Sequence, residues 1–159
     1  MKSILIIGTR DGGKSTTITE ICKMLKPSKV YSLNFTEKKL KPADVKDIYN
    51  NTFIIEVKGK LILVVAGAPT EQRISLKVII EICIEINIEI SFLIVAKRTY
   101  ERLNGFNTVN DINEYSQLIH TERVNPIELT DKNDLDSFKK NQLWINRIEK
   151  LTKIIEENI

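Results

Sequence analysis

The segment Gly8–Ser15 combines residue types that bind phosphate groups, at a fixed spacing. It reads Gly-Thr-Arg-Asp-Gly-Gly-Lys-Ser and matches the pattern G-x-x-x-x-G-K-[ST] at every specified position. Glycines allow successive backbone N–H groups to point toward one phosphate oxygen. The Lys14 ammonium adds positive charge beside the β- and γ-phosphates, and the Ser15 hydroxyl is an oxygen ligand of the kind that Mg²⁺ prefers. The segment therefore predicts a site for Mg²⁺ and the phosphates of ATP or GTP.

The residues around this loop predict the elements that position it. The apolar run 3–7 is typical of a buried strand, and the next apolar residues follow a helical spacing from Gly13 to Leu25. A loop between a strand and a helix places the positive end of the helix dipole next to a bound phosphate. The predicted nucleotide-binding residues are Gly8, Arg10, Asp11, Gly12, Gly13, Lys14, Ser15 and Thr16.

Within the loop, two residues are predicted to be catalytic and one to hold the metal. Lys14 is predicted to stabilise the charge on the transferred phosphoryl group. Arg10 either reaches a phosphate, where it would stabilise the transition state, or points to solvent. Ser15 is the predicted Mg²⁺ ligand.

The middle of the chain predicts strands joined by a hairpin and by a helical crossover. The apolar runs Thr52–Val57 and Leu61–Val65 flank a short turn, which indicates an antiparallel hairpin. A helix over 71–87 followed by a strand over 90–96 would supply the crossover that parallel strands require. The pattern thus favours an α/β domain whose sheet is mostly parallel with one antiparallel hairpin strand.

Further along the chain, the spacing predicts a helix over 111–120, a short strand over 126–129 and one long C-terminal helix. After Asp134, a mostly apolar series of positions steps by three and four, which is typical of an amphipathic helix. These positions are Phe138, Asn141, Ile145, Ile148, Thr152, Ile155 and Ile159. No linker or repeat interrupts the chain, so we expect a single domain over residues 1–159.

The intact loop 8–15 and the predicted order of elements resemble the P-loop NTPases, and the small GTPase-like branch in particular. The resemblance implies a three-layer P-loop NTPase fold and Mg²⁺-dependent nucleotide binding. It also implies an Asp-x-x-Gly motif after the second hairpin strand and an Asn-Lys-x-Asp motif after the next parallel strand. In this chain the segment after the second hairpin strand is Ala66-Gly67-Ala68-Pro69-Thr70-Glu71, and the segment after the next strand is Ala96-Lys97-Arg98-Thr99. Both motifs are therefore missing.

Each missing motif has a chemical consequence. Without the carboxylate that reads guanine, we expect ATP to be favoured over GTP, with Lys97 and Arg98 as base-side candidates. Without the acid after the hairpin, Mg²⁺ is held either by Ser15 and the phosphates alone or with a carboxylate from Asp11, Asp44 or Glu71.

These observations predict a Mg-nucleotide-binding protein whose NTP hydrolysis is slow or depends on a partner protein. Two alternatives remain open. One is a small-molecule or nucleotide kinase in which Arg98 and Arg102 contact phosphates. The other is a non-catalytic nucleotide-binding or partner-binding module that keeps the loop and has lost hydrolysis.

The composition bears on three further properties, namely nucleic-acid binding, membrane association and the state of the cysteines. The 24 basic and 21 acidic side chains give a net charge of +3, which carries no strong signal for nucleic acid. No apolar run approaches the ~20 residues of a membrane span, so we expect no membrane partner. Cys22 and Cys83 lie in apolar patterns without a C-x-x-C spacing, which favours reduced core thiols in a cytoplasmic protein.

Overall fold

The computed structural model describes residues 1–9, 12–127 and 129–159. In this part of the chain, seven strands form one sheet in the order β3-β2-β4-β5-β6-β1-β7. The strands are β1 (Lys2–Gly8), β2 (Lys29–Asn34), β3 (Lys39–Pro42), β4 (Thr52–Val57), β5 (Lys60–Val65), β6 (Phe92–Arg98) and β7 (Gln117–Arg123). The helices are α1 (Lys14–Leu25), α2 (Pro69–Gln72), α3 (Leu76–Glu85), α4 (Thr108–Tyr115) and α5 (Gln142–Glu156), with 3-10 turns η1 (Val45–Asp47) and η2 (Ser137–Lys140).

The structure is α/β, but the prediction of a mostly parallel sheet with one antiparallel hairpin strand is wrong. In the described residues, β3-β2, β2-β4 and β4-β5 are antiparallel pairs, whereas β5-β6, β6-β1 and β1-β7 are parallel. Residues 35–38 between β2 and β3 are too few for a crossover, which needs a dozen residues or more. The chain after α1 therefore turns back on itself and extends the β4-β5 hairpin into a four-stranded antiparallel half.

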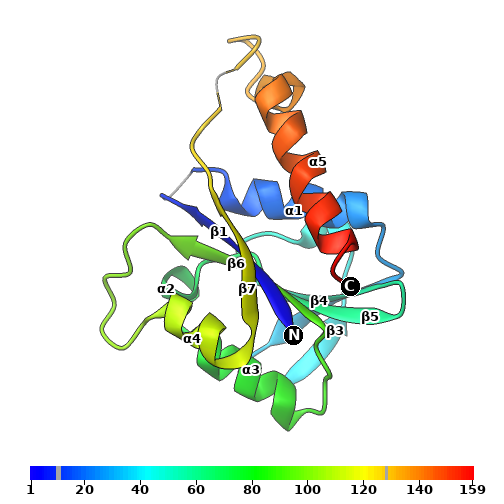
Figure 1. Cartoon of the computed structure of the whole chain (residues 1–159), viewed down its shortest axis with the longest axis vertical. Helices are drawn as coiled ribbons and strands as arrows, with labels where there is room; N and C mark the ends of the chain where they lie inside the picture. The colour runs from blue at the N-terminus through cyan, green and yellow to red at the C-terminus, as the bar shows by residue number, and fades with distance from the viewer. Residues whose placement is uncertain (10–11, 128) are drawn as a thin grey trace.

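Helices cover both faces of the sheet. On one face α1 and α5 pack with Ile4 and Ile6 of β1, and on the other α3 and α4 pack with Leu5 and Ile7. Successive β1 side chains thus enter opposite layers, as expected for a strand buried on both faces. Figure 1 shows α1 and α5 on one side of the sheet and α2, α3 and α4 on the other.

The C-terminal third differs from the sequence-based prediction. The long helix predicted from Asp134 begins only at Gln142, after η2, and the Asn141 side chain accepts a hydrogen bond from Leu143 N at its start. The helix predicted over 111–120 ends at Tyr115, and β7 takes its last residues. The strand predicted over 126–129 is absent from the described residues of that range, and residue 128 lies outside the described residues. The last strand is β7, and Pro126 and Ile127 follow it outside any strand.

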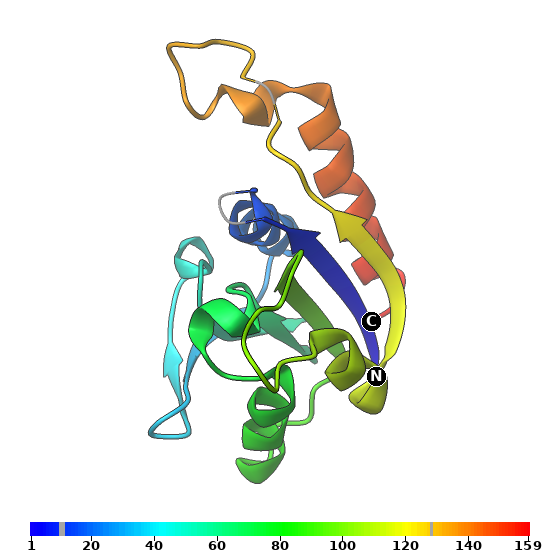
Figure 2. The same cartoon turned by 90° about the vertical axis from the view of Figure 1, so that its left-hand side faces the viewer.

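This arrangement brings the ends of several strands to one edge of the sheet. The parallel strands β5, β6, β1 and β7 point their carboxyl ends toward the loop that leads into α1. The segment between β7 and α5 extends beyond that same end, as Figure 2 shows in yellow and orange. Among the helices of the described residues, none combines the length and apolarity needed to cross a bilayer.

Candidate functional site

The loop after β1 is shaped by its own backbone. Gly12 N donates to Thr9 O at 3.0 Å, and Gly13 has a φ of 94°, a left-handed conformation that favours glycine. Gly13 is also the N-cap residue of α1, where no side chain caps the helix. Within the described residues, Gly13 therefore leaves the first backbone N–H groups of α1 without a side-chain cap, as an anion site at a helix N-terminus requires. Two predicted site residues, Arg10 and Asp11, lie outside the described residues.

Lys14 is held across this loop. Its side chain is only 6% exposed, and its Nζ donates to Thr9 O at 2.8 Å. The same Nζ lies 3.5 Å from Glu71 Oε1, which also accepts a hydrogen bond from Arg98 Nε at 3.0 Å. Glu71 thus lies between two cations, one from the loop and one from the end of β6.

Ser15 lies among oxygen atoms. Its Oγ is 2.7 Å from both Asn50 Oδ1 and Ala66 O, and Asn50 N donates to it at 3.3 Å. A hydroxyl carries one proton, so it donates to one of these two oxygens at a time. Oxygen donors of this kind suit a hard cation such as Mg²⁺.

Gly67 permits the approach that brings Asn50 to Ser15. A Cβ at Gly67 would lie 2.2 Å from Asn50 O, so a larger residue cannot occupy this position without displacing the chain. The N–H groups of Ala66 and Gly67 both donate to Asn51 O. The missing motif after β5 is therefore replaced by a sequence of small residues that packs directly against the chain entering β4.

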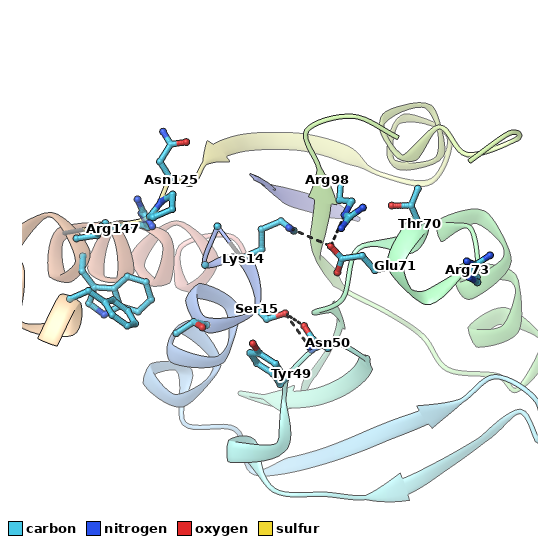
Figure 3. Close-up of a pocket in the computed structure, with 17 residues that line it drawn as sticks. Lys14, Ser15, Tyr49, Asn50, Thr70, Glu71, Arg73, Arg98, Asn125 and Arg147 are labelled. Carbon is cyan, nitrogen blue, oxygen red and sulfur yellow. Dashed lines mark hydrogen bonds and ion pairs between the residues drawn. The ribbon is translucent and has the colours of Figure 1, made fainter. Parts of the chain in front are cut away.

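These elements enclose a pocket of about 820 Å³, which falls within the usual size range for small-molecule sites. Figure 3 shows Lys14 between two halves, with Asn125 and Arg147 on one side and Thr70, Glu71, Arg73 and Arg98 on the other. The lining residues are Gly12, Gly13, Lys14, Ser15, Thr16, Tyr49, Asn50, Thr70, Glu71, Arg73, Arg98, Asn125, Pro126, Ile127, Phe138, Trp144 and Arg147.

The charge of the pocket is predominantly positive. Among the lining residues that the structure describes, Lys14, Arg73, Arg98 and Arg147 are cationic and Glu71 is acidic. A concave site with an excess of one charge attracts ligands of the opposite sign. The pocket is therefore suited to a polyanion.

Gly8 ends β1 and is not among the lining residues of the pocket, and the other predicted site residues that the structure describes fall into three groups. Five of the loop residues line the pocket together, namely Gly12, Gly13, Lys14, Ser15 and Thr16. Of the base-side candidates, Arg98 lines the pocket, whereas the Lys97 ammonium donates to the carbonyl oxygens of Arg98 and Thr99. Of the alternative acids in the described residues, Glu71 reaches Lys14, whereas Asp44 caps η1.

Sequence reasoning missed Asn50, although the hairpin contained a signal for it. Thr52 pairs with Val65 at the end of the hairpin, so the residues before Thr52 must lie beside those after Val65. By contrast, Arg147, Trp144 and Phe138 reach the pocket through the packing of α5 and η2, for which the local sequence offers no signal.

Comparison with protein-family models, with curated proteins and with solved structures gave no match. The functional assignment therefore depends on the geometry and chemistry of this pocket.

Proposed function

We propose that the chain binds a nucleoside triphosphate with Mg²⁺, ATP in preference to GTP, and hydrolyses it slowly unless a partner protein assists. The observation that carries this proposal is the position of Lys14 and Ser15 on one cationic pocket at the N-terminus of α1. A triphosphate would accept hydrogen bonds from the loop and charge stabilisation from Lys14. Two buried free thiols, Cys22 and Cys83, are compatible with a cytoplasmic location.

The residues near Ser15 fit a magnesium ion. Ser15 Oγ would hold the ion together with phosphate oxygens and water, and Asn50 and Ala66 would fix the orientation of the Ser15 hydroxyl. When bound, the ion neutralises charge on the phosphate oxygens. In the described residues no cluster of three or more His, Cys, Asp or Glu side chains offers a site of another kind.

Glu71 is the carboxylate that we assign to the attacking water. It lies 3.5 Å from the Lys14 ammonium, on the side of the pocket opposite Asn125 and Arg147. A carboxylate at this place can accept a proton and orient water for in-line attack. Its contacts with Lys14 and Arg98 must first loosen, which gives a physical reason for slow turnover without a partner.

Phosphoryl transfer to a small anionic acceptor is the second candidate. Arg73 and Arg98 line the same half of the pocket as Glu71 and could bind an acceptor carrying a phosphate or carboxylate. Arg102, which the kinase alternative also invoked, is absent from the lining of the described pocket. Phosphate release measured with and without candidate acceptors separates transfer from hydrolysis.

Calorimetry with Mg-ATP tests the proposal directly. We expect Lys14→Ala to abolish measurable binding, because the buried Lys14 ammonium contacts the loop directly at Thr9 O. Lys23→Ala is the matched control, since Lys23 is an exposed lysine in the last turn of the same helix. Equal affinity of wild type and Lys14→Ala for Mg-ATP would refute the proposal.

A further inference from the structure

The half of the pocket that contains Arg147 differs from the half that contains Glu71. Its walls are Asn125, Pro126 and Ile127 after β7, with Phe138, Trp144 and Arg147 from η2 and α5. Val124 N donates to Ile7 O at 2.8 Å, so the chain after β7 is fixed beside the start of the phosphate-binding loop. This half therefore begins where the phosphates would end and is lined by apolar and aromatic groups.

Arg147 is supported by an aromatic pair. The Phe138 and Trp144 rings meet edge to face, with centroids 5.0 Å apart, and the Arg147 guanidinium carbon lies 6.0 Å from the Trp144 ring centroid. Trp144 is buried, at 5% exposed, so its ring forms a fixed base for the guanidinium. Arg147 thus packs on Trp144 and forms no ion pair with another of the described residues.

The guanidinium of Arg147 is available to a ligand. It is partly buried and lines the pocket, yet in the described residues no acceptor lies within hydrogen-bond distance of it. Burial lowers the pKa of this guanidinium and the charge of Glu122 partly opposes that effect, so the group stays charged. A guanidinium that lines the pocket and makes no hydrogen bond within the described residues has N–H groups that a ligand can use as donors in place of water.

We infer that this half of the pocket binds the purine base of the nucleotide, with Arg147 donating to the base and Pro126 and Ile127 packing on its face. A purine offers N7 as an acceptor in both adenine and guanine, whereas a pyrimidine has no such atom. The planar guanidinium can also stack on a base. This inference rests on the proposed triphosphate site and adds the class of nucleotide that the site selects.

The test compares nucleotides that differ only in the base. Affinities for Mg-ATP, Mg-GTP, Mg-CTP and Mg-tripolyphosphate are measured by calorimetry on wild type, Arg147→Met and Arg123→Met. Arg123 is an exposed arginine at the end of β7 and serves as the matched control. We expect wild type and Arg123→Met to bind both purine nucleotides about tenfold more tightly than CTP. In Arg147→Met the preference for purines over CTP should fall to about twofold, and the loss of one pocket cation should weaken tripolyphosphate no more than it weakens CTP.

Tryptophan fluorescence gives a second readout that needs no variant. The chain contains one tryptophan, Trp144, so its emission reports on this half of the pocket alone. ATP should change the emission, and tripolyphosphate should leave it unchanged. CTP binding as tightly as ATP, or no fluorescence response to bound ATP, would overturn the inference while leaving the triphosphate site intact. Failure of tripolyphosphate and all nucleotides to bind would instead overturn the proposed function and this inference with it.

Discussion

The Glu71 carboxylate lies 3.5 Å from the Lys14 ammonium and 3.0 Å from Arg98 Nε. Glu71 follows β5, Lys14 follows β1 and Arg98 ends β6, so three elements of the sheet edge meet at this carboxylate. The contact has two consequences for a triphosphate ligand. Under the proposed function, Glu71 would compete with the phosphates for Lys14, and it is also the acid that we assign to the attacking water.

Glu71→Gln should separate these two effects. Removing the negative charge beside Lys14 should raise the affinity for Mg-ATP about threefold to tenfold, because a carboxylate near a bound phosphate is repulsive in a partly buried site. The same change should lower single-turnover hydrolysis at least about tenfold, because an amide cannot accept a proton from water. Glu89→Gln, at an exposed residue, should change neither quantity. Unchanged hydrolysis in Glu71→Gln would remove Glu71 from the mechanism.

Turnover by the isolated chain should be slow. The loop supplies positioning, but in the described residues the one acid at the pocket is tied to Lys14 and Arg98. We therefore expect a rate near that of unassisted GTPases, about 10⁻⁴–10⁻³ s⁻¹. Phosphate release with Mg-ATP measures it, and a rate above about 1 s⁻¹ without any partner would contradict this mechanism.

The parts of the fold that sequence could predict have local causes. The β4-β5 hairpin follows from two apolar runs around a two-residue turn at Lys58 and Gly59, and α1 follows from regular apolar spacing after the loop. The segment β3 could not be predicted in this way, because a short edge strand with a single leucine between lysines carries no apolar alternation. Its pairing with β2 is a tertiary effect.

In the candidate site too, some features have local causes in the sequence and others depend on tertiary packing. Lys14 and Ser15 belong to a contiguous motif, so their shared position could be predicted from sequence alone. The contact of Glu71 with Arg98 depends on β5 and β6 being parallel neighbours. The approach of Arg147 depends on how α5 packs on α1, and no pattern within α5 specifies that packing. Long-range packing therefore determines the half of the pocket that contains Arg147, and the sequence alone does not predict that half.

The two thiols predict how stability changes in alkaline solution. Burial raises the pKa of both Cys22 and Cys83 from 9.0 to about 12. Between these pH values the unfolded chain loses thiol protons that the folded chain keeps, so the free energy of unfolding falls as pH rises. From pH 8 to 10 the two thiols together should lower it by about 3 kcal/mol.

Urea unfolding at both pH values measures this loss, and the double variant Cys22→Ala with Cys83→Ala isolates the thiols from other titrating groups. The double variant should lose less stability over this interval than wild type. An equal loss in both proteins would show that the thiols do not cause the alkaline effect.

Gly67→Ala should damage both stability and the metal side of the pocket. The new Cβ would lie 2.2 Å from Asn50 O, which forces the backbone at residue 50 away from Ser15. We expect a loss of about 3 kcal/mol in the free energy of unfolding, at the upper end for overpacked sites. Gly59→Ala is the control, because its added Cβ meets no described atom within 4 Å and only its φ of 73° is unfavourable. That variant should lose about 1 kcal/mol and keep its Mg-ATP affinity.

The affinities of Gly67→Ala and Gly59→Ala for Mg-ATP test the role of Asn50 more directly than their stabilities do. Displacing Asn50 removes a partner of the Ser15 hydroxyl, so Mg-ATP binding should weaken in Gly67→Ala, whereas ATP binding in the presence of a chelator should be the same in both variants. Calorimetry below the unfolding temperature of both proteins keeps stability out of the comparison. If Gly67→Ala binds Mg-ATP as well as Gly59→Ala does, then Asn50 has no part in holding the metal, and Ser15 would act with the phosphates and water alone.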